Sequence, residues 1–570
     1  MVVVCSFLIP PKQMSASSCY DSLRMTESVK PETPDFTAKD RQFVDLYDNN
    51  NGSYTGGQIT FDGQSLVNSH RYLDLKSSYL TVPITATLTV DTTTIAGAAG
   101  AANAFAVSLK NGSLQLINGL TVNLANQSVI NLQSFSNIPA TYKILSTWTD
   151  SDQETYGPSM NFWKDDGQSC AWNASHGELN NAVGIVAQTL ANPWPTNGGR
   201  RMRLMRNWVT PVNQGGTSLA PGAMGASQDL TTLTTAQRSV VTVNSGTPTT
   251  LVFNINAQIP LRYLHDLFDK MPIHRGALWQ FTFHTHIPST FTQTMTADAN
   301  DTHVIKAVAP TVNNTMNGFC PWMISPPGKS TGVSGLAITA TSLDYNVSLE
   351  TRVGNSQTST CVLHCAMIEL ENSVACSYIA NPRRRVVYTD FIRNPPNALQ
   401  GVPAGNTVRA NITAGIAKPR GLLIFPHLAT GENGTVGPSA LSSPWSSCGA
   451  TTASGAFLNN FNVQVNGANI YEKNIRYRYD HFLREQFGVL SPSGNGVDGM
   501  RVGLLDEMDF NSSYGFVYVN LERHPKANDN VPAAIDIELT NGSKQKMSYM
   551  CFILFEREFE IDSYTGKLVI

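Results

Sequence analysis

The stretch VFNINAQIPLRYLHDLFDKMPIHRGALWQFTFHTH, residues 252–286, contains three successive patterns. Apolar and polar residues alternate up to Ile259, which predicts a strand. Between Pro260 and Pro272, leucine, phenylalanine and methionine recur at helical spacing, and the prolines limit that helix. After Gly276 the alternation returns in ALWQFTFHTH. The stretch therefore predicts a short helix held between two strands.

Length and composition favour two β-rich domains. A chain of 570 residues is too long for one ordinary hydrophobic core. Only 14% of the residues are charged, and the abundance of Gly, Asn and Thr disfavours helices. The net charge is −3. Because the chain has no arm of clustered lysine and arginine, we do not expect it to neutralise nucleic-acid phosphates as its main role.

The cysteines and the apolar runs limit the class of protein further. The nine cysteines are odd in number and scattered, and no CxxC pair occurs. This argues against a disulfide framework and a zinc ribbon, so we expect reduced thiols. The N-terminus lacks a basic region before its apolar run, and no run of 18 apolar residues exists. We therefore expect no signal peptide and no transmembrane helix; residues 94–109 are expected to be a loop leading into a strand.

The order of patterns along the chain predicts four segments. Residues 1–40 lack periodicity and are expected to be a flexible N-terminal arm. Strand patterns dominate residues 41–372, with a large loop insertion near 150–235 that has few regular periods. A helical connector at 373–384 then leads to a second strand-rich half at 385–570.

The two halves resemble each other. LTVNLANQSV at 120–129 and FNVQVNGANI at 461–470 share a pattern 341 residues apart, and each precedes a helix-compatible segment with aromatic residues. Nearly the same offset places FVDLYD at 43–48 beside RVVYTD at 385–390. Two similarities at one offset indicate a duplicated domain.

Each half fits about eight short strands with interrupting loops and one or two helices. We therefore predict an all-β chain: two tandem eight-stranded antiparallel jelly-roll sandwiches with short clamp helices and long surface loops. The loops at 150–235 and 430–455 are expected to form a common raised surface.

Three stretches resemble the double jelly-roll major capsid proteins of the adenovirus and tectivirus lineage, nearest to those of Polinton-like viruses, adintoviruses and virophages. They are IPLRYLHDLFDKMPIHRGALWQFTFHTH at 259–286, CVLHCAMIELENSVACSYIANPRRRVVYTDFI at 361–392 and the C-terminal stretch from GFVYVNLERH to residue 570. The resemblance covers about a third of the chain directly. It implies a homotrimer of pseudo-hexagonal outline, because each subunit brings two similar rolls, and it implies that such trimers tile an icosahedral shell.

Several polar clusters could bind a metal or take part in chemistry instead of serving only in packing. His265, Asp266 and Asp269 are expected on a solvated or interface-facing side of the short helix. His284 and His286 share a strand face and could hold a metal with a third ligand, but no third ligand is nearby in the sequence. In CVLHC, alternation places Cys361 and Cys365 on one face and His364 on the other, which suits packing better than a metal site. The remaining candidates are the acidic group Asp506, Glu507 and Asp509 and the basic runs at 198–206 and 381–385.

For the acidic group we expect a helix start or a charged intersubunit rim rather than a cation site. For the basic runs we favour salt bridges between subunits over contact with a genome. No G-x-S-x-G, H-E-x-x-H or P-loop pattern occurs. We therefore assign no catalytic, cofactor-binding or metal-binding residue, expect no cofactor and do not expect an enzyme.

The predicted function is that of a structural major capsid protein of a DNA virus. Its partners would be itself, as a homotrimer with lateral capsomer contacts, together with penton and minor capsid proteins. It would not bind nucleic acid strongly, and the N-terminal arm is a candidate for contact with an internal membrane. The protein would be assembled inside the host cell and located in the virion.

Two alternatives remain at this point. One is a secreted or surface carbohydrate-binding or carbohydrate-active double β-sandwich protein. The other is a viral protein with a single jelly roll from a different lineage. The carbohydrate alternative needs paired carboxylates and an aromatic platform, for which the first half offers Trp148, Trp163, Trp172, Trp194 and Trp208.

Overall fold

The computed structural model describes residues 38–569 with gaps, the longest of which are 93–103, 165–209, 219–239, 326–343, 430–457 and 487–501. Three predicted features lie entirely or largely outside the described residues: the N-terminal arm, the loop at 430–455 and the basic run at 198–206. The predicted insertion near 150–235 is described only at its start and in short strands.

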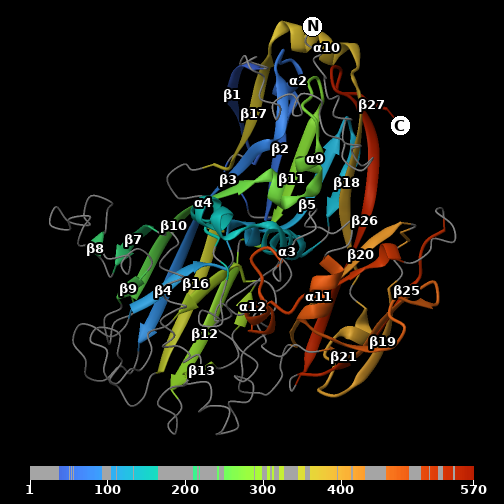
Figure 1. Cartoon of the computed structure of the whole chain (residues 1–570). Helices are drawn as coiled ribbons and strands as arrows, with labels where there is room; N and C mark the ends of the chain where they lie inside the picture. The colour runs from blue at the N-terminus through green and yellow to red at the C-terminus, as the bar shows by residue number, and fades with distance from the viewer. Residues whose placement is uncertain are drawn as a thin grey trace, which may run out of the picture.

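The first unit contains two antiparallel sheets that enclose one core (Figure 1). One sheet has the order β1 (Ala38–Tyr47), β17 (Val362–Leu370), β3 (Tyr72–Thr92), β10 (Thr249–Pro260), and the other has β2 (Gln58–Asp62), β11 (Trp279–Thr285), β5 (Ile117–Leu124), β6 (Gln127–Leu132). The first strand of the unit thus pairs with the last. This interleaved order is that of a jelly roll.

The second unit repeats this order. One sheet has β18 (Arg383–Asn394), β26 (Met547–Asp562), β20 (Pro419–Leu428), β24 (Val517–Asn520), and the other has β19 (Thr407–Ile412), β25 (Ile535–Asn541), β21 (Leu458–Val465), β22 (Ala468–Asn469). The similar stretches found 341 residues apart are the hairpins β5–β6 and β21–β22. The predicted duplication and the predicted all-β double jelly-roll class are confirmed.

The alternation that predicted the strand after Gly276 reflects burial on one face of β11. Trp279, Phe281 and Phe283 are fully buried, while the polar residues between them are partly exposed. Phe281 lies opposite Phe61 of β2 and opposite a valine of β5. Since side chains alternate between the faces of a strand, one face of β11 fills the core of the first unit.

Further strands enlarge the first unit beyond its two four-stranded faces. On one sheet, β16 (Asp344–Val353) continues beside β3, and β12 (Ser289–Ala297) pairs with β16. The shorter elements are β13 (Ile305–Ala307), β14 (Thr311–Asn313), β7 (Thr210–Gln214) and β8 (Thr217–Ser218), together with the small sheet of β15 (Trp322–Ser325), β4 (Ala104–Leu109) and β9 (Val240–Thr242). In the second unit, β23 (Ile475–Tyr477) pairs with β21 and β27 (Leu568–Val569) with β26.

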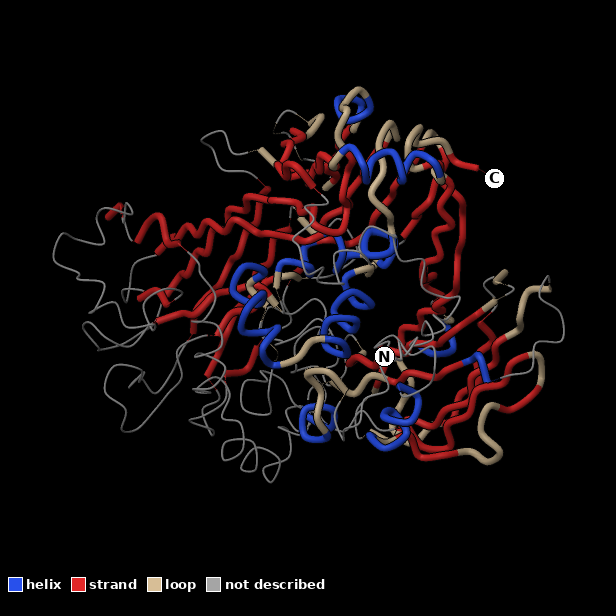
Figure 2. The backbone as a smooth tube through the Cα atoms, turned by 45° about the horizontal axis from the view of Figure 1, so that its top comes forward, coloured by secondary structure: helices blue, strands red, loops and turns tan. Residues whose placement is uncertain are grey.

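The helices are short. They are α2 (Gln64–Val67), α3 (Asn137–Thr147), α4 (Asp150–Met160), α8 (Leu261–Leu264), α9 (Asp266–Lys270), α10 (Asn372–Ala380), α11 (Tyr479–Gln486) and α12 (Glu507–Ser512), with 3-10 turns η1 (Ser113–Leu116), η4 (Asn397–Leu399) and η5 (Leu521–Arg523). As predicted, α3 and α11 follow the two similar hairpins. Helix α10 lies between β17, the last strand of the first unit, and β18, the first strand of the second. Figure 2 shows that helices gather between the two groups of strands. Within the described residues, no helix is long and apolar enough to cross a membrane.

Two local predictions differ from the structure. The single helix predicted between Pro260 and Pro272 is broken at His265, whose φ of −151° and ψ of 145° are extended. The region from residue 150, expected to have little regular structure, begins with α4. Thr149 and Asp152 form a capping box there, which stabilises a helix start despite a weak apolar pattern.

Candidate functional site

The surface between the two units, here called the inter-unit interface, brings together most of the polar residues that the sequence singled out. From the first unit it contains β6, α3, α8 and α9, and from the second unit β18, β24, β26 and α11. Figure 1 shows α3 and α9 at the junction of the units. It is a packing surface assembled from side chains of both units.

The short helix α9 covers the free edge of β18. His265 Nδ1 accepts a hydrogen bond from the Leu267 N–H at 3.2 Å and so caps α9. The next residue, Asp266, accepts a hydrogen bond from the Thr389 N–H of β18 at 3.0 Å. An edge strand exposes unpaired N–H groups, and Asp266 satisfies one of them. The expectation of an interface-facing helix side is confirmed, and α9 covers a sandwich edge that belongs to the other unit.

Asp390 is the buried centre of this interface. Arg557 donates to Asp390 Oδ2 at 3.0 Å, and His265 Nε2 lies 3.4 Å from Asp390 Oδ1. Arg557 and Tyr388 each also donate to the Val129 carbonyl of β6, at 3.1 and 2.6 Å. Burial by itself would raise the pKa of Asp390, but His265 and Arg557 outweigh it and the pKa is lowered.

The two acidic residues of α9, Asp266 and Asp269, each pair with a lysine side chain. Asp266 accepts a hydrogen bond from Lys143 Nζ of α3 at 3.2 Å, and Asp269 lies 2.9 Å from Lys76 Nζ of β3. Burial acts to raise both pKa values, yet the lysines and hydrogen bonds lower both. The two carboxylates are therefore charged structural groups.

An aromatic cluster forms the apolar part of the interface. Tyr142 of α3 is buried and contacts three rings of the second unit: Phe516 at 5.1 Å between centroids, Tyr518 at 6.1 Å and Phe482 at 6.5 Å. Its hydroxyl accepts a hydrogen bond from Gln486 of α11. Aromatic contacts of this kind add to the stabilisation from buried area.

The acidic group at 506–509 starts α12 and contacts the first unit. Asp506 accepts a hydrogen bond from the Asp509 N–H at 2.8 Å, as a helix cap does. Lys164 donates to Asp509 at 2.6 Å and to the Leu504 carbonyl at 2.8 Å. The prediction of a helix start is confirmed.

A cavity of about 110 Å³ lies within the interface. Its walls are mostly apolar, and its basic residues are Lys143, Arg420 and His265, the last of which lies beside Asp390. Lys143 binds Asp266, and Arg420 pairs with Glu522 at 3.3 Å and Glu556 at 2.5 Å. Since each cation already pairs with a carboxylate, the cavity contains no uncommitted acid–base pair.

The histidines at the end of β11 have separate surroundings. His284 is half-buried, and burial lowers its pKa. His286 is fully buried, with Nε2 3.5 Å from Asn137 Oδ1 and its ring 6.2 Å from that of Phe135. Across the described residues, no three His, Cys, Asp or Glu side chains are grouped as metal ligands.

The CVLHC stretch packs as the alternation predicted. Cys361 and Cys365 are fully buried free thiols, and burial raises the pKa of each to about 12. His364, on the opposite face, stacks on Tyr79 at 4.5 Å, and its Nδ1 lies 2.6 Å from Asp45. The two thiols therefore serve as small apolar side chains.

The described residues of the basic run at 381–385, and Trp148 of the tryptophan-rich region, make packing and ion-pair contacts within the chain. In the run at 381–385, Arg385 forms an ion pair with Glu558, and Arg384 lies 4.7 Å over the Tyr378 ring. Trp148 is buried and contacts Phe162 and Tyr263 at 5.3 and 5.2 Å. Trp163, Trp172, Trp194 and Trp208 lie outside the described residues.

Sequence reasoning missed several residues of the interface. Tyr142, Asp390, Arg557 and Lys164 were not singled out, because none belongs to a motif and their partners are distant in the chain. One signal was present: Asp390 ends the RVVYTD stretch, whose counterpart at 43–48 also ends in aspartate.

No family model matches the chain, and no curated protein matches it. Several solved structures are similar to it. The Sputnik virophage structure has 13% identity and a TM-score of 0.47, with 95% of this chain and 90% of that chain covered. The mavirus major capsid protein has 9% identity and a TM-score of 0.42, with 95% and 92% covered. The Faustovirus major capsid protein has 10% identity and a TM-score of 0.39, with 93% and 92% covered.

Proposed function

We propose that the chain is a structural major capsid protein that forms pseudo-hexagonal homotrimers, and that these trimers tile an icosahedral viral shell. The observation that carries the proposal is the repeated strand order: two jelly rolls in one chain, which we assign to residues 41–372 and 385–570. Three such chains contain six similar rolls, so a threefold assembly acquires a nearly sixfold outline.

The inter-unit interface supports this proposal physically. A tile must hold its two rolls in one fixed orientation. Tyr142, Asp390 and Lys164 are each engaged with the opposite unit through aromatic packing, an ion pair or a hydrogen bond. A closed ring of identical contacts can then form between copies, as symmetric oligomers require.

The proposal assigns the protein to the virion, after assembly inside the host cell. Its partners are further copies of itself in trimers and lateral contacts, with penton and minor capsid proteins. The N-terminal residues 1–40 are proposed to face the interior, toward minor proteins or a membrane. With a net charge of −3, assembly is not expected to depend on nucleic acid.

The carbohydrate alternative is not favoured. It needs an exposed aromatic platform beside paired carboxylates. Trp148, the one candidate platform residue within the described part of the chain, is buried. The carboxylates Asp266, Asp390 and Asp509 each hold a lysine or arginine.

Light scattering on a sizing column tests the proposal. A stable species of three times 61.9 kDa supports it, and electron microscopy of that species should show hexagonal outlines. A monomer at every concentration tested, with no trimer after removal of nucleic acid or after its addition, would count against the capsomer.

A further inference from the structure

The free edges of β18 and β1 differ in one respect. Each is the first strand of its jelly roll and pairs along one edge with the last, β18 with β26 and β1 with β17. The other edge of β18 is covered by α9 of the first unit, through Asp266 and Thr389. Among the described residues, no strand pairs with the other edge of β1. An edge strand without a partner strand favours association with another chain.

The outward face of β1 also carries exposed aromatic side chains. Phe43 is 54% exposed and Tyr47 is 66% exposed, with Asp45 between them. Phe43 contacts Tyr79 at 5.6 Å, and Tyr79 stacks on His364. Exposed aromatic groups of this kind are typical of protein interfaces.

The internal repeat allows the surroundings of β18 to be compared with those of β1. In the first unit, Ala140 and Lys143 of α3 line the cavity against Thr389 of β18. The offset of 341 residues places His481 and Arg484 of α11 at the positions of Ala140 and Lys143. The offset of 342 residues between 43–48 and 385–390 places Tyr47 at the position of Thr389. The burial patterns of β1 and β18 agree with this match, because Leu46 and its counterpart Tyr388 are both buried, whereas Tyr47 and Thr389 are not.

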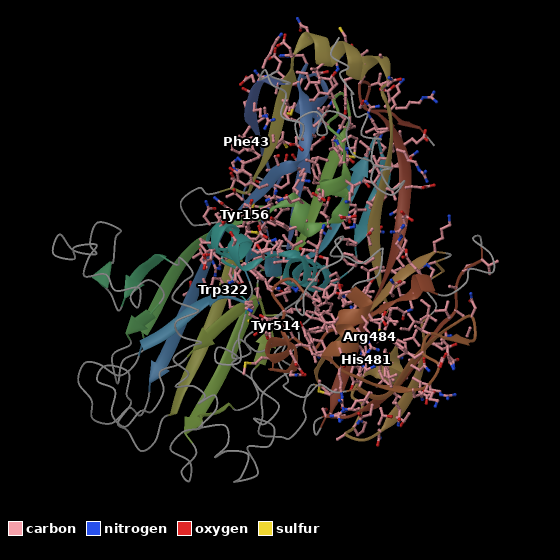
Figure 3. All side chains as sticks on the ribbon, viewed as in Figure 1. Phe43, Tyr156, Trp322, His481, Arg484 and Tyr514 are labelled. Carbon is pink, nitrogen blue, oxygen red and sulfur yellow. The ribbon has the colours of Figure 1, made fainter. Side chains whose placement is uncertain are left out.

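The α11 surface cannot reach β1 within one chain. Figure 1 places β1 in the upper part of the molecule and α11 in the lower part, and Figure 3 shows Phe43 far from His481 and Arg484. Arg484 is exposed, and the Asp45 carboxylate is 44% exposed. An arginine can pair with that carboxylate and stack on the neighbouring tyrosine ring.

We propose that α11 of one copy docks on β1 of a second copy, with Arg484 against Asp45 and Tyr47. The inference rests on the proposed homotrimer and names its intersubunit surface. The contact between copies repeats the contact between the two units of one chain, so that three copies close a ring of six rolls.

A charge-reversal cycle tests the contact. Asp45→Arg and Arg484→Asp should each raise the dissociation constant of the trimer about tenfold or more, because each places like charges together. The double variant should recover most of that loss. Arg409→Asp is the matched control: Arg409 is an exposed arginine paired with Glu538 in the second unit, and its reversal should leave the trimer intact.

Tyr47→Ser should also weaken the trimer, whereas Val531→Ser, at a side chain 55% exposed elsewhere, should not. Circular dichroism and the thermal midpoint show whether each variant folds. If a variant does not fold, Tyr47→Cys with Arg484→Cys provides a second test. In a Cys376→Ser background, which removes the exposed native thiol, oxidation of the double variant should yield species in which positions 47 and 484 of different chains are linked by a disulfide.

The outcomes separate the two proposals. A monomeric wild type overturns the proposed trimer and this contact together. If the wild type is a trimer and the variants Asp45→Arg, Arg484→Asp and Tyr47→Ser all keep the trimer mass, only the contact is overturned. A disulfide of Tyr47→Cys to Cys5 or Cys19 of the same chain would assign the β1 face to the N-terminal residues and would also overturn it.

Discussion

Asp390 is a buried carboxylate with partners from both units. Asp390→Ala removes the partner of Arg557 and of the buried His265. Arg557 is 37% exposed, so water compensates part of its loss, and we expect a reduction of about 2–3 kcal/mol in the free energy of unfolding. Denaturant titration at neutral pH measures this change.

The control is Glu558→Gln, which removes an exposed ion pair with Arg385 on the same two strands. It should cost less than about 1 kcal/mol. Because the pKa of Asp390 is lowered in the folded protein, its contribution to the free energy of unfolding depends on pH. The contribution is complete above the pKa of an unfolded aspartate, near 3.9, and is lost as the pH falls below that value. Equal effects of the two variants would contradict a central role for Asp390.

His274 is a buried neutral histidine outside the inter-unit interface. Its Nδ1–H donates to the Pro272 carbonyl at 2.8 Å, and its Nε2 accepts from Trp279 Nε1 at 2.7 Å. Burial lowers its pKa from 6.5 to about 4. The unfolded chain therefore binds the proton first. The stabilisation is complete above pH 6.5 and is lost as the pH falls toward 4, by about 2–3 kcal/mol.

His274→Gln should remove this part of the pH dependence, because its amide oxygen can accept from Trp279 and does not titrate. The measurement is the free energy of unfolding at several pH values between 7.5 and 4. His70→Gln is the control, since it removes a histidine whose side chain is 76% exposed and leaves the contribution of His274 to the slope in place. An unchanged slope in His274→Gln would show that other groups cause the acid sensitivity.

The turn before α12 fits closely against the end of α3. Leu504 N–H donates to the Leu145 carbonyl at 2.8 Å. Gly503 has a φ of +57°, and a Cβ there would lie 2.5 Å from the Leu145 carbonyl oxygen. Gly503→Ala must therefore separate the turn from α3, and we expect a loss of about 2–4 kcal/mol.

Gly405→Ala separates the two causes of that loss. Gly405 also has a positive φ, +76°, but a Cβ there would meet no atom within 4 Å. It should cost only the backbone strain, about 1 kcal/mol. Thermal unfolding of both variants gives the comparison. Similar losses would mean that the turn moves freely and that the close approach is unimportant.

The elements with a regular alternation of buried and exposed residues could be predicted from the sequence. The strand β11 and the two hairpins follow from local periodicity, because one face of each is buried. The break at His265 does not. There the extended backbone is stabilised by the cap to Leu267 and by Asp390, and Asp390 lies 125 residues away in the sequence. A helical pattern of apolar residues contains no information on such a partner.

For the whole molecule, duplication could be predicted but the packing of the two rolls could not. The similar stretches at one offset predicted two units of one architecture. The interface depends on Tyr142, Asp390 and Lys164, whose partners lie in the other unit. No motif relates these residues. The acidic group at 506–509 was recognised as a helix start, whereas its contact with Lys164 needed the three-dimensional structure.

This interface should make the two units unfold together. Tyr142→Ala removes a fully buried ring between Phe516, Tyr518 and Phe482, at a cost of about 3–5 kcal/mol.

We expect the wild type to show one calorimetric transition and Tyr142→Ala to show two, since the loss falls on the contact between units. Phe61→Ala removes a ring of similar size inside the first unit. It should lower the midpoint and keep one transition, because the coupling is intact. A single transition in Tyr142→Ala with calorimetric and van't Hoff enthalpies still equal would mean that the polar contacts of Asp266, Asp390 and Lys164 suffice to couple the rolls.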